Sequence, residues 1–332
     1  MPNPPAATPM AFVRAMVLAY RKYGVDPTAA LRAAQIAPRE LRRIDARITA
    51  AQMEAFSAHA MRELDDEALG WFGRRLPWGS YGMLCRASIT APTLGLALAR
   101  WCRHHRLLTD DVLLSLQADG EVARLAIDER RALDPVLREF CLLTLLRYVH
   151  GYACWAVDSR IPVLEATFPH APPRHHRAYA LMFPGPVRFD ADRAGFAFDA
   201  QYLALPLRRD ERALRAMLQR ALTLTVRPYR RDRLLVQRVR ELLPRHPTAE
   251  ALAAALHVSV RTLHRQLRDE GASLQSLKDE VRRDRALELL ARARQPVKQV
   301  ARAVGFASEK SFARAFRHWT GRSPSDVRRG TP

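Results

Sequence analysis

Residues 303–324 read AVGFASEKSFARAFRHWTGRSP, and this stretch decides the architecture of the chain. Just before it stand an apolar and a small residue, Val300 and Ala301, and within it Ser308 is followed by apolar positions at helical spacing. Two short helices that cross closely need a small residue at the crossing, and a serine is a favoured first cap of the second helix. The sequence therefore predicts a helix-turn-helix unit over about residues 297–319.

The same pattern occurs a second time, 48 residues earlier. Leu252, Ala253 and Ser259 repeat the order of apolar, small and serine residues, with one residue fewer in the turn. This predicts a first helix-turn-helix unit over about residues 249–270. Two such units in one chain are a far more specific signal than one.

A single helix is expected to join the two units. Ser273 is its predicted cap, and apolar residues follow at helical spacing from about residue 274 to 293, with a change of face near Arg283. At 1.5 Å per residue such a helix is about 30 Å long, close to the roughly 34 Å of one turn of B-DNA. The spacing would allow two recognition helices to enter successive major grooves.

Charge supports a polyanionic partner for this part of the chain. The protein has 54 Lys and Arg against 34 Asp and Glu, a net charge of +20, and residues 228–332 hold 23 basic and 11 acidic residues. Arginine predominates, and its planar fork suits phosphates and guanine edges. A GC-rich genome would explain Arg in place of Lys, but not the concentration of net charge in one segment. Double-stranded DNA is the predicted partner.

The remaining two thirds of the chain mix helices and strands. Helical spacing covers residues 11–64, 93–108 and 135–156, while apolar alternation over 112–127 predicts a hairpin and further strands are expected within 161–199. We predict a mainly α protein: an α+β N-terminal domain over 1–227 for effector sensing and dimerisation, then an all-α DNA-binding domain over 228–332.

Composition excludes several classes of protein. The chain of 332 residues is long enough for two or three domains, and its apolar runs are shorter than the roughly 20 residues that a bilayer helix needs. The N-terminus lacks the basic start of a secretory signal. Four cysteines, at positions 85, 102, 141 and 154, show no zinc or disulfide spacing. We therefore expect a cytoplasmic protein with no membrane contact, no metal site and no cofactor.

The chain resembles the AraC/XylS family of transcriptional regulators. The GF-x-S, F-x-R-x-F and T-G-x-S-P elements at residues 305–308, 312–316 and 320–324 carry this likeness, which extends over about Pro247 to Arg328. Scattered elements of the N-terminal part, such as SITAPTLGLAL at 88–98, resemble the arabinose-binding-like regulatory domain of this family. The resemblance implies a sensing or dimerising domain and does not fix arabinose as the ligand.

The family's recognition helices, matched onto this sequence, imply a set of DNA contacts. The base-facing positions would be Arg261, Thr262, His264, Arg265, Glu309, Lys310, Ser311 and Arg314. Better placed for phosphates are Ser259, Arg268, Lys298, Ser308, Arg317 and Arg322. Glu309 is unusual, because a carboxylate beside DNA is unfavourable unless it accepts from cytosine or orients an arginine. For each charged position, a solvated helix face is the alternative explanation.

Effector contacts are expected where aromatic and polar residues combine, as in small-molecule pockets. The candidates are Trp78, Tyr81, Cys85, Trp101, His104, Arg106 and Trp155, for each of which an ordinary core or surface role is the alternative. The predicted function is that of a sequence-specific DNA-binding regulator that responds to a small-molecule effector. The resemblance to the family implies that it activates transcription and contacts RNA polymerase. A homodimer is a further expectation.

Two other functions agree with only part of the sequence. A nucleoid-type protein would bind DNA by charge alone, but it needs neither two capped recognition helices nor a large partner domain. A DNA-repair enzyme carrying AraC-type helix-turn-helix units would need a zinc-bound cysteine cluster or a Pro-Cys-His motif, and neither occurs in the sequence. We therefore predict no catalytic residues.

Overall fold

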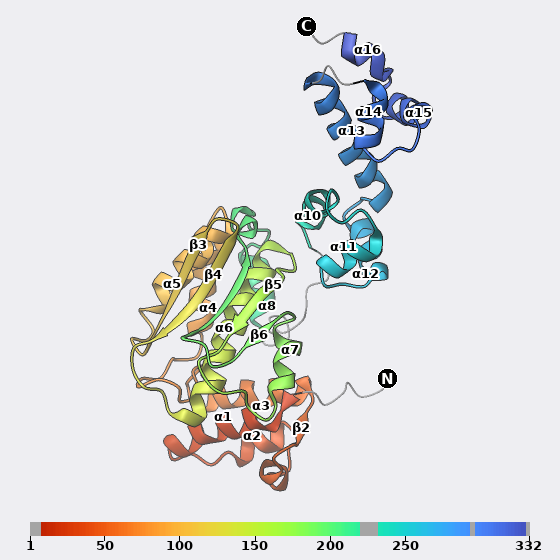
Figure 1. The fold of residues 1–332 in the computed structure, drawn as a ribbon. Helices are drawn as coiled ribbons and strands as arrows, with labels where there is room; N and C mark the ends of the chain where they lie inside the picture. Colours follow the sequence, from red (N-terminus) through yellow and green to blue (C-terminus); the bar gives the residue numbers. More distant parts are fainter. Residues whose placement is uncertain (1–7, 220–231, 293–295, 330–332) are drawn as a thin grey trace. The chain divides into compact units, whose positions relative to one another are not determined.

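The computed structural model describes residues 8–219, 232–292 and 296–329, which fall into two compact units, Met1–Arg230 and Arg231–Pro332 (Figure 1). The domain boundary predicted after residue 227 lies outside the described residues. Within the described residues, the N-terminal unit contains helices and a sheet, whereas the C-terminal unit contains helices alone. The predicted fold class, α+β followed by an all-α tandem of helices, is confirmed.

The N-terminal unit combines helices with a five-stranded sheet. The helices are α1 (Met10–Lys22), α2 (Thr28–Ala33), η1 (Pro38–Arg42), α3 (Ala50–Glu63), α4 (Ser80–Ile89), α5 (Leu94–His105), α6 (Pro135–Val157), η2 (His176–Ala178), α7 (Tyr179–Met182), η3 (Ala200–Ala204) and α8 (Glu211–Leu218). The strands are β1 (Thr8–Pro9), β2 (Arg47–Ile48), β3 (Val112–Asp119), β4 (Val122–Glu129), β5 (Val163–Thr167), β6 (Val187–Arg188) and β7 (Ala194–Asp199). β1 and β2 form a separate two-stranded pair.

The larger sheet has the strand order β3-β4-β7-β5-β6. β3 and β4 form the expected hairpin, which Gly120 turns with a φ of +55°. The further strands expected within residues 161–199 are β5, β6 and β7. β6 pairs with β5 in parallel, and β7 lies between β4 and β5. As a central strand, β7 is buried at every residue from Ala194 to Phe198. The alternation of residues in its sequence therefore does not mark a face exposed to solvent.

The helix α6 forms the centre of the N-terminal core. It contacts α1, α5 and β7, and nearly every residue of its second half is buried. Asp134 caps its start by accepting the backbone N–H of Val136. Among the described helices, α6 alone is long and apolar enough to cross a membrane, but 83% of its most apolar window is buried inside the protein, as in the core helix of a folded domain.

The C-terminal unit consists of seven described helices. These are α10 (Leu235–Leu242), α11 (Ala249–Ala255), α12 (Val260–Asp269), α13 (Leu274–Arg292), α14 (Val297–Ala303), α15 (Glu309–Thr320) and α16 (Pro324–Arg329). Two separate cores form along α13. Its first half, with Leu274 and Leu277, packs with α10, α11 and α12. Its second half, with Ala286 and Leu290, packs with α14 and α15.

This division explains the change of face in the apolar pattern of α13. The first half of α13 turns its apolar residues toward α10, α11 and α12, and the second half turns them toward α14 and α15. No single apolar stripe therefore runs along the whole helix. Ser273 caps the helix as expected, since its hydroxyl accepts the backbone N–H of Ser276 at 3.0 Å. Ala293, the predicted last residue, lies outside the described residues. The helix α10, which joins the first core, was not anticipated.

Candidate DNA interface and effector cavity

The second helix of the first unit, α12, separates an apolar side from a basic side. Leu263 and Leu267 are fully buried in the core formed with α11 and α13. The side chains of Arg261, His264 and Arg265 are exposed, and Arg268 follows one turn later on the same exposed side. Residues three and four apart lie on one face of a helix, so these side chains form one continuous basic surface.

Ser259 fixes the start of α12. Its hydroxyl accepts the backbone N–H of Thr262 at 3.1 Å and lies 2.8 Å from the Thr262 hydroxyl. Thr262 is consequently half-buried, unlike the other three predicted base-facing residues of this helix. Both hydroxyls already take part in the cap, which holds the first turn in the geometry that a recognition helix requires.

The second unit repeats this construction in α15. The Ser308 hydroxyl accepts the backbone N–H of Ser311 at 3.1 Å, and the two hydroxyl oxygens lie 2.9 Å apart. Phe312 and Phe316 are buried, with ring centroids 5.5 Å apart. The predicted contact residues all lie on the exposed side, namely Glu309, Lys310, Ser311, Arg314 and Arg317. Phe306 and Trp319 are partly buried and pack against the edge of this core.

The basic side chains of the two recognition helices have no carboxylate partner among the described residues. Within the described part of the chain, no carboxylate lies within ion-pair distance of the basic side chains Arg261, Arg265, Arg268, Lys298, Lys310, Arg314 and Arg317. Some arginines elsewhere in the unit are paired: Arg238 lies within ion-pair distance of Asp232, and Arg285 of Glu288. Arg322, the remaining phosphate candidate, is exposed and donates to the Asp326 carbonyl at 3.3 Å.

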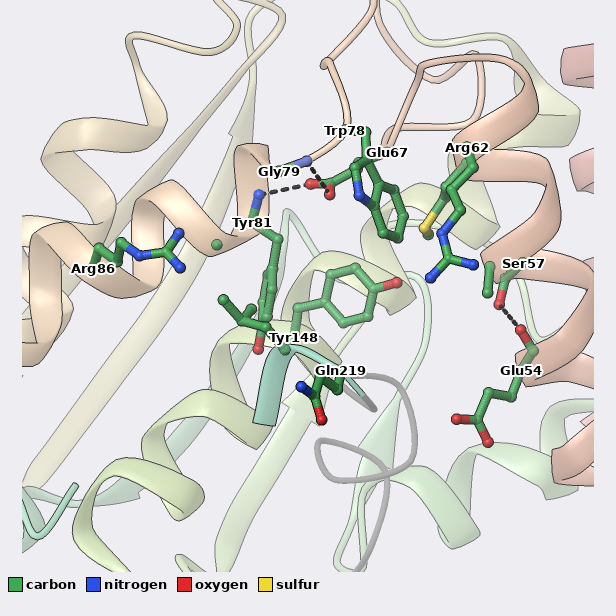
Figure 2. Close-up of a pocket in the computed structure, with 14 residues that line it drawn as sticks. Glu54, Ser57, Arg62, Glu67, Trp78, Gly79, Tyr81, Arg86, Tyr148 and Gln219 are labelled. Atoms are coloured by element: carbon green, nitrogen blue, oxygen red, sulfur yellow. Dashed lines mark hydrogen bonds between the residues drawn. The ribbon is translucent and has the colours of Figure 1, made fainter. Parts of the chain in front are cut away.

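A cavity of about 230 Å³ lies in the N-terminal unit between α3, α4, α6 and the end of α8 (Figure 2). Its lining comprises Glu54, Ser57, Ala58, Met61, Arg62, Glu67, Trp78, Gly79, Tyr81, Gly82, Arg86, Tyr148, Leu218 and Gln219. The aromatic rings of Trp78, Tyr81 and Tyr148 form much of its wall, and charged side chains line it from several sides.

Two of the seven predicted effector residues, Trp78 and Tyr81, line this cavity. Trp101 is buried behind Tyr81, with ring centroids 5.5 Å apart, and lines a neighbouring cavity of about 40 Å³. Cys85 is buried on α4, one turn after Tyr81, and burial raises the pKa of its thiol.

The other three candidates are not among the lining residues of the 230 Å³ cavity. His104 and Arg106 lie at the end of α5, and Trp155 lies near the end of α6, with the Arg209 guanidinium 6.0 Å from its ring centroid. The sequence identifies aromatic residues with polar neighbours, but residue type alone does not show which of them line the same cavity.

Sequence reasoning missed the charged lining residues. Glu54, Ala58, Met61 and Arg62 form one stripe of α3 at spacings of four, seven and eight residues, a pattern visible in the sequence. Because both ends of this stripe are charged, it resembles a solvated helix face. Tyr148 lies on α6, whose apolar residues surround it in the sequence and conceal it.

Fixed polar contacts hold the cavity wall. The Glu67 carboxylate accepts the backbone N–H groups of Gly79 at 2.7 Å and Tyr81 at 2.6 Å, as Figure 2 shows. Burial raises the pKa of Glu67 despite these contacts. The Arg86 guanidinium pairs with Glu211 of α8 at 3.2 Å, and thereby joins α4 to the last described helix of the unit.

Two family models match the chain, and several known regulators are similar to it. The family described as "Arabinose-binding domain of AraC transcription regulator, N-term" matches residues 24–207, and the family described as "Helix-turn-helix domain" matches residues 252–330. The ornithine utilization regulator of Pseudomonas aeruginosa is 29% identical over 96% of both chains. The transcriptional activator RhaS of Escherichia fergusonii is 37% identical over 24% of this chain and 30% of its own length.

A solved structure is also similar over most of the chain. The transcriptional regulator CdpR from Pseudomonas aeruginosa has 24% sequence identity and a TM-score of 0.36, and the match covers 92% of this chain and 96% of that chain.

The class of protein that the two capped helix-turn-helix units define is a DNA-binding transcription regulator. More closely, the chain belongs to the AraC family of transcription regulators, because the N-terminal regulatory domain of that family matches more than half of its length.

Proposed function

We propose that this regulator recognises promoter DNA by inserting α12 and α15 into two successive major grooves. The observation that carries this proposal is the set of basic side chains on both helices, exposed and without a carboxylate partner in the described residues. Such side chains lose no internal ion pair when they bind DNA. The residues that would contact bases are Arg261, His264 and Arg265 on α12 and Lys310, Ser311 and Arg314 on α15. Thr262 and Glu309 would lie at the edges of these two surfaces.

Phosphate contacts would set affinity and register rather than sequence preference. Arg268 and Arg317 follow the base-facing residues along their helices, and Lys298 and Arg322 lie outside them. Ser259 and Ser308 would contribute through the helix starts that they cap, where backbone N–H groups favour an anion.

The N-terminal unit would sense a small molecule in the 230 Å³ cavity. The cavity is bounded by Leu218 and Gln219 at the end of α8, the last described helix before the C-terminal unit, so an occupant would contact this helix. The relative that is 29% identical over nearly the whole chain is named for ornithine utilization, which makes ornithine and similar metabolites the first compounds to test. No cofactor is required by this scheme.

The output would be activation of transcription in the cytoplasm through contact with RNA polymerase, with two copies of the chain on one promoter. Activation follows the printed name of one relative and the resemblance of the helix-turn-helix units. A nucleoid-type protein that binds DNA by charge alone is the alternative. It would need neither the two capped recognition helices nor the cavity.

Capture of genomic DNA tests the proposal. The purified full-length protein is mixed with fragments of its own genome at about 150 mM salt, with and without a metabolite extract, and the bound fragments are sequenced. We expect enrichment of a few promoters with paired half-sites roughly 10 bp apart. The variant Ala58→Trp, which fills the cavity from α3, should bind the same promoters but lose any effect of the extract. Uniform recovery that fades with salt in every condition would favour the charge-driven alternative.

A further inference from the structure

One face of α3 carries two opposite charges into the cavity. Glu54 and Arg62 lie eight residues apart, so about 12 Å of helix separates their backbones, and Ala58 and Met61 lie between them. In Figure 2 both charged side chains border the same hollow, with the Tyr148 ring across from them. The cavity therefore has a positive end, a negative end and an apolar wall between the two.

Neither of these two charges has a counter-charge among the residues that the structure describes. Within the described residues, the Arg62 guanidinium has no carboxylate within ion-pair distance and lies over the Trp78 ring, 4.8 Å from its centroid. The Glu54 carboxylate accepts no hydrogen bond from any described residue. A charge at the wall of a cavity is stabilised when a bound group of opposite charge replaces the water around it.

The other charged lining residues are already compensated. Arg86 pairs with Glu211, and the Glu67 carboxylate accepts two backbone N–H groups at the start of α4. A ligand is therefore not needed to balance them. The charges that remain for a ligand are one cation and one anion, both on α3.

From this pattern we propose that the cavity binds a small zwitterion of the amino-acid class, with its carboxylate on Arg62, an ammonium group on Glu54 and its carbon chain against Met61 and Tyr148. The inference rests on the proposed effector role of this cavity. A volume of about 230 Å³ lies below the roughly 300–1,000 Å³ of sites for drug-sized ligands, which suits a metabolite of this size. A neutral sugar would leave both charges uncompensated, and a fatty acid would place its chain beside Glu54.

Matched probes with the same five-carbon chain separate the two charges. Binding of 5-aminopentanoate, pentanoate and pentylamine to the full-length protein is measured by calorimetry, with L-ornithine as an amino-acid probe. We expect 5-aminopentanoate and L-ornithine to bind roughly 10–100-fold more tightly than pentanoate or pentylamine, the range that one charged hydrogen bond contributes. Equal binding of all four probes would overturn the charge assignment.

Variants then assign each charge to its residue. In Arg62→Gln the advantage of 5-aminopentanoate over pentylamine should disappear, while its advantage over pentanoate remains. Glu54→Gln should show the opposite pattern, and Arg62→Lys should keep most of the wild-type preference because it keeps the charge. Arg32→Gln, on the exposed side of the adjacent helix α2, is the matched control and should change none of these ratios. A general loss of affinity for all probes in both cavity variants would contradict the assignment.

The same experiment separates this inference from the proposed function. If a metabolite extract changes DNA binding in the wild type but not in Ala58→Trp, and the active fraction is neutral or carries only one kind of charge, the effector role stands and the zwitterion assignment is wrong. If the extract has no effect and no probe binds, both are wrong.

Discussion

At the scale of single residues, the charged side chains of the chain divide by whether the fold supplies a partner. Arg285 on α13 is paired with Glu288 at 2.6 Å, whereas Arg265 on α12 projects outward with no ion-pair partner among the described residues. An arginine that the fold leaves exposed and unpaired is available for a guanine edge or a phosphate. Exposed arginines without a carboxylate partner also occur elsewhere in the described residues, Arg245 and Arg302 among them, so it is the position of Arg265 on α12 that favours a contact with DNA.

Replacement of Arg265 should lower the affinity for DNA and reduce the preference for one base. Because a bidentate contact to guanine contributes about 1–3 kcal/mol, we expect Arg265→Ala to lose roughly 5- to 150-fold in affinity for a captured promoter and to lose preference at one base position. Arg285→Ala, in the same unit, should leave both unchanged. The measurement is binding to a set of single-base variants of that promoter. Equal losses on every variant would assign Arg265 to a phosphate instead.

Two buried histidines predict a pH dependence of stability. Burial lowers the pKa of His105 and of His150 to about 4, and for His150 the nearby Arg147 charge adds to the effect. In the unfolded chain the usual pKa of about 6.5 applies, so the unfolded state takes up protons that the folded state refuses. The contribution of the neutral histidines is complete above pH 6.5 and is lost as the pH falls toward 4.

The test is the free energy of unfolding of the N-terminal unit within the full-length protein at pH 7 and pH 5. The wild type should be less stable at pH 5, and His105→Phe, next to Phe72, should lose less stability over this interval. The exposed His176 offers a control, since His176→Gln should follow the wild type. An unchanged pH slope in His105→Phe would show that this residue does not stay neutral in the fold.

At the scale of elements, each helix-turn-helix unit depends on a small core of its own. Phe312 and Phe316 are fully buried between α14, α15 and the second half of α13. We expect Phe316→Ala to cost about 3 kcal/mol through the cavity it leaves, and to abolish DNA binding by unfolding this core. Phe316→Leu should retain most of the stability. Chemical denaturation of the two variants measures their free energies of unfolding. A folded Phe316→Ala protein that binds DNA as tightly as the wild type would contradict this role for Phe316.

The helices and strands also show which features of the fold the sequence patterns predict. The capped helices and their buried leucines and phenylalanines follow from local chemistry, because serine caps and helical spacing act over a few residues. The neighbours of β6 and β7 do not follow, because pairing between distant strands depends on the whole sheet. The cavity shows the same limit: Trp78 and Tyr81 were selected by residue type, but Tyr148 and the α3 stripe join them only through tertiary packing.

At the scale of the whole molecule, we expect the net charge of +20 to contribute affinity for DNA and the helices α12 and α15 to contribute selectivity. Each phosphate contact should steepen the dependence of binding on salt by about 0.9 in a plot of logarithms. Lys298→Ala should reduce this slope by about one without changing the preferred sequence. If the preferred sequence changes while the slope stays the same, Lys298 contacts bases.

We expect one chain to read two half-sites on one face of DNA, because the continuous helix α13 packs against both helix-turn-helix units. Insertion of 5 bp between the half-sites of a captured promoter tests it most directly, since half a helical turn places the second half-site on the opposite face. We predict that binding falls to the level of a promoter with one half-site destroyed. Binding at the original affinity to the promoter with the insertion would contradict the account.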